Sequence, residues 1–178
     1  MNPERSISVS INYFKSKPDL PSSSSIDMLR VFYRNQITEH NGGLLLVDFF
    51  KHENITGIET LFKIPLSPSG TVYLASLTIP FRSSSYVIKV QAREMGLTGV
   101  RDAVISDRLT KKGDNENWSA DPYNPNFTDG TLMNRSEDPT YDSEFPDHPL
   151  SEARRIIAEI KKGMKFKPEI GELKEFKK

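Results

Sequence analysis

Cysteine is absent from this 178-residue sequence, and neither sign of charge predominates. Without cysteine the chain cannot form disulfides, use a thiolate nucleophile or hold zinc through sulfur. The 24 Lys and Arg residues balance the 24 Asp and Glu residues, so there is no basic excess to attract nucleic-acid phosphates. These absences predict no nucleic-acid partner, and a chain without cysteine fits a reducing, cytoplasmic location.

Long hydrophobic runs are also missing. The longest, Leu44 to Val47, ends at the charged residue Asp48, whereas a membrane-spanning helix needs about 20 apolar residues. The first residues lack the basic and apolar stretches of a secretion signal. With 36% hydrophobic and 27% charged residues, the composition is that of an ordinary globular protein. The sequence therefore predicts a soluble domain without a membrane span.

Sequence motifs of catalysis and cofactor binding are lacking as well. The sequence contains no G-x-S-x-G nucleophile elbow, no P-loop and no G-x-G-x-x-G fingerprint. We therefore expect no cofactor. The absence of these motifs favours a binding protein over an enzyme but leaves enzymatic activity undecided.

What the sequence does contain is a strong β pattern. From Ser6 to Phe14 apolar and polar residues alternate, which is typical of a half-buried strand. Short links containing Pro, Gly, Asn or Ser separate four further segments, and short links favour antiparallel neighbours. We therefore expect a twisted antiparallel sheet of about five strands, with the other four at Leu44 to Lys51, Ile58 to Ile64, Thr71 to Ile79 and Ser85 to Arg93.

Three helices should flank this sheet and complete an α+β fold. The first begins after Ser24 or Ser25 and the last after Ser151, because serine favours the N-cap position. Both helices carry apolar residues at intervals of three and four. These are Ile26, Leu29, Tyr33 and Ile37 in the first helix, and Ala153, Ile156, Ile157, Ile160 and Met164 in the last.

The middle helix supplies the first group of candidate binding residues. Thr98 can cap this helix, and its apolar side, with Val100, Ala103, Val104 and Leu109, should face the core. The charged side would then face solvent. This arrangement predicts a polar contact patch at the edge of the sheet, made of Arg93, Thr98, Arg101 and Asp102.

A long acidic loop is expected within the single domain. The domain covers residues 1–164, the loop covers 111–150, and a tail rich in Lys and Glu at 165–178 should fray into solvent. The aromatic residues of the loop are spaced so that they could pin it onto the body. They are Trp118, Tyr123, Phe127, Tyr141 and Phe145, of which Trp118 and Tyr123 are candidate contacts for a partner.

The end of this loop holds the candidate metal ligands. Asp142, Glu144, Asp147 and His148 combine carboxylates with an imidazole, which could bind a metal ion or act as a general base. They support the alternative of a metal-dependent hydrolase. The other interpretation is a solvated acidic surface that leads into the last helix.

A family resemblance rests on the central block of the chain. The segment IETLFKIPLSPSGTVYLASLTIPFRSSSYVIKVQARE, from Ile58 to Glu94, is followed by TGVRDAV, from Thr98 to Val104. In the order of its elements, over about half of the chain, it resembles the PsbP and Mog1-like proteins. The resemblance implies an α/β/α sandwich and an accessory or adaptor role without enzymatic activity, and it carries over no individual residue.

The function favoured by these observations is non-enzymatic binding, with another protein as the expected partner. The binding surface would be the acidic loop with its aromatic residues or the polar face of the sheet. A third possibility is a small-molecule binder that uses Lys89, Gln91 and Arg93 on that sheet face.

Overall fold

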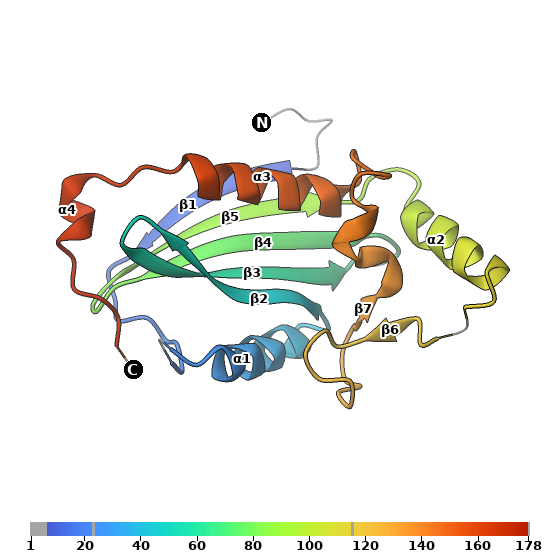
Figure 1. Ribbon diagram of the computed structural model, residues 1–178, viewed down its shortest axis with the longest axis horizontal. Coiled ribbons are helices and arrows are strands. Elements are labelled where there is room, and N and C mark those ends of the chain that lie inside the picture. The colour runs from blue at the N-terminus through green and yellow to red at the C-terminus, as the bar shows by residue number, and fades with distance from the viewer. Residues whose placement is uncertain (1–6, 23, 115, 178) are drawn as a thin grey trace.

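The computed structural model describes residues 7–22, 24–114 and 116–177, and a five-stranded antiparallel sheet forms its centre (Figure 1). The sheet has the order β1-β5-β4-β3-β2, so only β1 leaves the order of a simple meander. This confirms the predicted α+β fold and antiparallel sheet. The strands are β1 (Ile7–Phe14), β2 (Gly43–His52), β3 (Ile55–Pro65), β4 (Thr71–Pro80) and β5 (Ser85–Arg93).

Helices cover both faces of this sheet. Helix α3 (Pro149–Gly163) packs on β4 and β5, and α1 (Ile26–Glu39) packs on β2. Alternate strand residues point to opposite faces. Thus Leu61 contributes to the core under α3, while its neighbour Phe62 packs in the second core beside α1. The sheet therefore separates two hydrophobic cores.

The sequence predicted the N-cap of α1 correctly but not the N-cap of α3. Ser25 caps α1 as expected, and its side chain accepts a hydrogen bond from the N–H of Met28. Helix α3 begins earlier than expected: His148 is its N-cap, and Ser151 lies inside its first turn. A proline can occupy the first turn because its missing N–H needs no partner there, so Pro149 allows this earlier start. The prediction of Ser151 as the cap is therefore wrong.

The two remaining helices extend the molecule at opposite ends (Figure 1). Helix α2 (Val100–Lys111) lies beyond one end of the sheet, and the short α4 (Pro168–Gly171) lies at the other. The long segment after α2 has short elements of its own, so it is more ordered than a plain loop. They are β6 (Ser119–Ala120), β7 (Met133–Asn134) and the 3-10 turns η1 (Arg135–Glu137) and η2 (Pro139–Tyr141).

The C-terminal tail does not fray over residues 165–177. Glu175 forms a β-bridge with Phe81, and the N–H of Arg82 donates to the carbonyl of Lys174. Phe176 is only 5% exposed and belongs to the core beside α1. The expectation of a solvated tail is wrong, because one aromatic side chain among the Lys and Glu residues gains burial by folding back.

The edge strand β1 is less buried than its alternating pattern predicted. Val9, Ile11 and Tyr13 share one face and remain 52%, 71% and 54% exposed. Helix α3 lies over β4 and β5 and leaves this row uncovered. No helix in the described ranges is long and apolar enough to cross a membrane.

Candidate functional site

Five exposed apolar residues lie close together in the sequence where β5 leads into α2, and we call this surface the apolar corner. It consists of Met95, Leu97, Val100, Ala103 and Val104. Leu97 is 86% exposed and Met95 is 61% exposed, and the two valines, one helical turn apart, are 43% and 41% exposed. Clustered apolar side chains on a surface mark interaction sites. The apolar corner is therefore a candidate docking surface.

The orientation of α2 keeps these residues outside. Its inner side is formed by Arg101, Ile105 and Leu109, all of which are buried. The prediction that Val100, Ala103 and Val104 face the core is therefore wrong, because the helix is rotated to bury an arginine. The same prediction for Leu109 is confirmed. Helical spacing alone could not reveal this, since it does not show which residues pack against each side of the helix.

Arg101 ties α2 to three later segments of the chain. Its Nε donates to the carbonyl of Ser136 at 2.7 Å, and its Nη2 donates to the carbonyl of Asp138 at 3.0 Å. Its Nη1 donates to Asp142 Oδ1 at 3.0 Å and to Ser151 Oγ at 2.9 Å. A guanidinium has enough donors, in a rigid plane, to serve all four acceptors. This network fixes the rotation of α2 and so holds the apolar corner in place.

The start of α2 is occupied by a carboxylate. Gly99 is the N-cap, in a left-handed conformation with φ 73°, and Thr98 makes no cap, contrary to expectation. Glu94 Oε1 accepts from the N–H of Gly99 at 3.2 Å and lies 3.4 Å from His148 Nε2. Burial would raise the pKa of Glu94, but hydrogen bonds from His148 and Gly99 outweigh it and lower that pKa. An external anion would compete with this carboxylate for the helix start.

The predicted polar contact patch is divided among different environments. Arg93 is exposed at the end of β5, and Thr98 is half-buried. Arg101 is 1% exposed. The half-buried Asp102 accepts a hydrogen bond from Asn134 Nδ2 at 3.1 Å. Of the four residues, only Arg93 has a solvent-exposed charged side chain beside the apolar corner.

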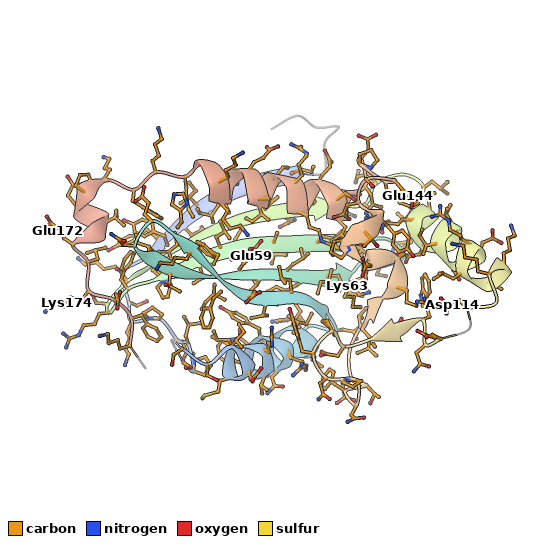
Figure 2. All side chains as sticks on the ribbon, in the orientation of Figure 1. Glu59, Lys63, Asp114, Glu144, Glu172 and Lys174 are labelled. Atoms are coloured by element: carbon orange, nitrogen blue, oxygen red, sulfur yellow. The ribbon has the colours of Figure 1, made fainter. Side chains whose placement is uncertain are left out.

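A second buried ion pair holds the long loop beside β3. Lys63 Nζ lies 2.7 Å from Glu137 Oε2, and both residues are almost fully buried. Glu137 also accepts from the N–H of Asn134 at 2.7 Å, which completes a capping box for η1. Burial raises the pKa of Glu137 even beside the ammonium group. Figure 2 places Lys63 near this loop, whereas Asp114 and Glu144 lie toward α2.

Tyr123 and Phe127 pin the loop to the body, as the sequence predicted. Tyr123 Oη accepts from the N–H of Val47 at 2.9 Å, and the guanidinium of Arg30 lies 3.9 Å from the centre of the Tyr123 ring. Arg34 lies 5.2 Å from the ring centre of Phe127. Such stacking of arginine on aromatic rings is attractive. Tyr123 is thus engaged inside the protein, which makes it less suited to a partner contact.

Trp118 remains closer to the surface. It is half-buried and lines an open depression of about 450 Å³ together with Arg135 and Tyr141. The depression lies in the acidic loop that the sequence singled out. Trp118 therefore belongs to a second surface that a partner could contact.

The predicted metal ligands lie in separate environments. Asp142 accepts hydrogen bonds from arginines of α2 and α3, and Glu144 accepts two from one arginine of α2. His148 caps α3, and Asp147 is exposed. Over residues 7–22, 24–114 and 116–177, no three His, Cys, Asp or Glu residues are grouped to hold a metal ion.

The predicted small-molecule face of the sheet is a row of polar side chains. Lys89, Gln91 and Arg93 alternate with the buried Ile88, Val90 and Ala92 along β5, so they lie on the face away from α3. Gln91 and Arg93 are exposed.

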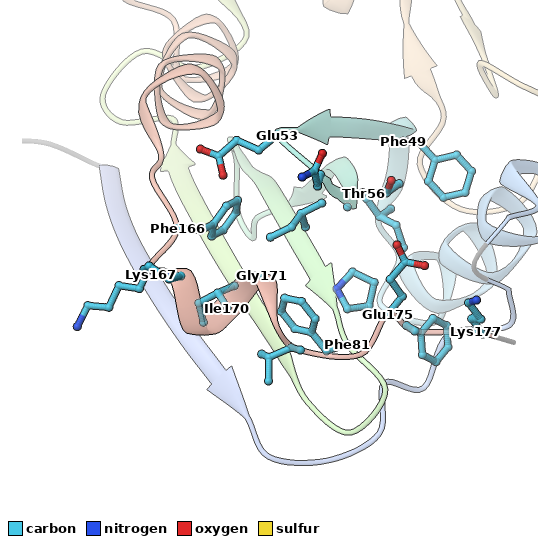
Figure 3. A pocket seen from close by; sticks show the side chains of 18 of the residues that line it. Phe49, Glu53, Thr56, Phe81, Phe166, Lys167, Ile170, Gly171, Glu175 and Lys177 are labelled. Atoms are coloured by element: carbon cyan, nitrogen blue, oxygen red, sulfur yellow. The ribbon is translucent and has the colours of Figure 1, made fainter.

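A cavity of about 470 Å³ lies near α4, between the β2–β3 turn and the C-terminal tail (Figure 3). Its walls include Phe49, Phe81, Phe166 and Phe176. This volume is within the range of small-molecule sites, roughly 300–1,000 Å³. The cavity exists because the tail folds back, and its site therefore could not be predicted from a tail expected to fray.

Neither the apolar corner nor this cavity was identified from the sequence. The available signals were Met95 and Leu97 beside glycines in a loop, and Phe166 and Phe176 in a tail otherwise rich in Lys and Glu. Both signals are short and lack periodicity. In the comparisons with known proteins, no family model and no curated protein matched this chain.

Proposed function

We propose that this chain is a non-enzymatic binding protein that docks another protein on its apolar corner. The observation that carries the proposal is the exposure of Leu97, at 86%, beside an exposed methionine and two exposed valines. Burying a leucine side chain contributes about 1.5–3 kcal/mol. A partner with an apolar pocket for Leu97 would gain this energy from one contact.

The rigidity of the corner supports the same proposal. Arg101 fixes α2 through four acceptors, and Glu94 holds the N–H of Gly99. A surface that is already ordered pays less conformational entropy on binding. The exposed Arg93 beside it would favour a partner with a carboxylate at the rim of its pocket.

The resemblance to the PsbP and Mog1-like proteins supports a partner-binding role. Helices on both faces of an antiparallel sheet are compatible with that resemblance. Fold alone does not determine function, so the proposal rests on the apolar corner.

The test is affinity capture from the source cells with matched baits. The full chain and a Val31→Asp variant should retain the same partner, because Val31 is 52% exposed on α1, away from the corner. Leu97→Asp should reduce capture about tenfold or more, since it places a charge in an apolar contact. Circular dichroism should show that both variants are folded.

Two further baits distinguish other binding surfaces. Trp118→Ala removes the aromatic residue of the loop depression, and Ile11→Asp places a charge in the exposed row of β1. Loss of the partner with either bait and not with Leu97→Asp would overturn the apolar corner as the docking surface. Failure of the full chain to retain any stoichiometric protein would overturn the function itself.

A further inference from the structure

The cavity near α4 has an apolar interior built from distant parts of the chain. Phe81 follows β4, Phe166 and Phe176 come from the tail, and Ile58 lies on β3. Phe81 and Phe176 are each 5% exposed and Ile58 is 2% exposed, so these walls belong to the packed core and are not loose surface groups. Aromatic walls on several sides favour a ligand with a flat or branched apolar body.

Charged groups surround the opening of this cavity. Glu53 and Glu175 contribute carboxylates, and Lys167 and Lys177 contribute ammonium groups. Figure 3 shows the carboxylate of Glu175 directed toward Thr56 across the cavity, whereas Lys167 points outward, away from it. Within the described part of the chain, neither Glu53 nor Glu175 takes part in an ion pair.

We propose that this cavity binds a small organic cation with an apolar, ring-sized body and one protonated amine. The body would lie against Phe81 and Phe166. The amine would lie at the opening, where it can meet the carboxylate of Glu175 and the faces of the aromatic rings, both of which attract cations. At the same place the carboxylate of Glu175 would repel a carboxylate ligand of the same shape, whereas Lys167 points away from the cavity.

This site is separate from the protein-docking surface of the proposed function. The apolar corner lies at the α2 end of the sheet and the cavity at the α4 end (Figure 1). The two hypotheses can therefore fail independently, and Leu97→Asp should leave ligand binding in the cavity unchanged.

The experiment uses three probes that share one apolar body. The probes are 1-naphthylmethylamine, 1-naphthalenemethanol and 1-naphthylacetate, titrated into the full chain by calorimetry. We expect the amine to bind in the millimolar range, as its size allows, and about tenfold more tightly than the acid, with the alcohol between them. Binding should shift the backbone amide signals of Gly57 and Gly171, which both line the cavity.

A matched pair of variants tests whether the charge of Glu175 contributes to binding of the amine. Glu175→Gln should weaken binding of the amine about threefold to fivefold and leave binding of the alcohol unchanged, because only the ionic contact is removed. Glu172→Gln, an exposed tail residue outside the cavity lining, should leave both unchanged. Both substitutions are at exposed positions and should preserve folding.

Several results would overturn the proposal. One is an acid that binds as tightly as the amine. A second is an equal loss in Glu172→Gln and Glu175→Gln, which would mean that only overall charge matters. A third is amide shifts that avoid Gly57 and Gly171, or no binding of the amine up to about 10 mM.

Discussion

Arg34 and Asp121 form a buried bidentate ion pair that joins α1 to the long acidic segment, 87 residues away in the sequence. Both N–O distances are 2.7 Å, from Nε to Oδ2 and from Nη2 to Oδ1. Asp121 also accepts from the backbone N–H groups of Tyr123 and Asn124. The carboxylate thus accepts hydrogen bonds from a turn of the loop and from a helix at the same time.

Breaking this pair from one side should be costly. Arg34→Met leaves the Asp121 carboxylate buried without its cation, and we expect a loss of about 3–5 kcal/mol in the free energy of unfolding. The measurement is urea denaturation followed by circular dichroism. The control is Arg155→Met, which removes an exposed pair with Glu159 on α3 and should cost less than about 0.5 kcal/mol. Equal losses in the two variants would contradict a buried pair that holds the loop.

The same pair predicts a dependence of stability on acid. Burial would raise the pKa of Asp121, but hydrogen bonds from Arg34, Tyr123 and Asn124 and the charge of Arg34 lower it below its usual value. A carboxyl with a lowered pKa in the folded state contributes stability above its unfolded pKa, about 3.9. That contribution is lost as the pH falls through the lower folded pKa.

Asp121→Asn should therefore flatten the acid limb of the stability profile. Below about pH 4 the variant should lose less free energy of unfolding per pH unit than the unmodified chain, because one titrating carboxyl is gone. Denaturation at a series of pH values measures this. Asp19→Asn, at an exposed position, should keep the original slope. A slope unchanged by Asp121→Asn would show that other groups carry the effect.

The sequence predicted the sheet well because the alternation of polar and apolar residues along a strand indicates which of its faces is buried. In β5, the alternation of Ile88, Val90 and Ala92 with polar residues corresponds to the buried and exposed faces that the structure has. The orientation of α2 depends instead on a partner elsewhere in the chain. Arg101 is buried because Ser136, Asp138, Asp142 and Ser151 supply its acceptors, and no local pattern could reveal four distant groups.

Two adjacent residues test the rotation of α2. Ile105 is fully buried, whereas Val104 is 41% exposed. Ile105→Ala should lower the free energy of unfolding by about 2–4 kcal/mol through lost contacts and a new cavity. Val104→Ala should change it by less than about 0.5 kcal/mol. If Val104→Ala lowered the free energy of unfolding more than Ile105→Ala, the rotation of α2 predicted from the sequence would be the correct one.

Arg101 itself should be irreplaceable by a shorter cation. Arg101→Lys keeps the charge, but an ammonium group cannot reach the four acceptors with the geometry of a planar guanidinium. We expect η1, η2 and α2 to loosen, with faster protease cleavage between residues 111 and 148. Arg108→Lys, which alters a partly exposed pair with Glu144, is the control and should be cleaved at the original rate. Similar cleavage of both variants would contradict the role of Arg101 as the tie between these segments.

The cavity near α4 could not be predicted from the sequence because it depends on where the tail packs. Local composition from residue 165 onward is dominated by Lys and Glu, which favours solvation. The burial of Phe176 beside Leu20 and Ile58 opposes that tendency, and both of these residues lie far from it in the sequence. The walls of the cavity depend on this long-range contact and on the β-bridge between Glu175 and Phe81.

Substitution of Phe176 tests whether the tail is part of the core. Phe176→Ala should cost about 3 kcal/mol or more in the free energy of unfolding, because it removes a 5%-exposed ring from a packed cluster. Leu173→Ala, three residues earlier and 39% exposed, should cost less than about 1 kcal/mol. Urea denaturation of the full-length variants gives both values. If the two costs are equal and small, the tail is not held by Phe176, and the walls that Phe166 and Phe176 give to the cavity would be absent in solution.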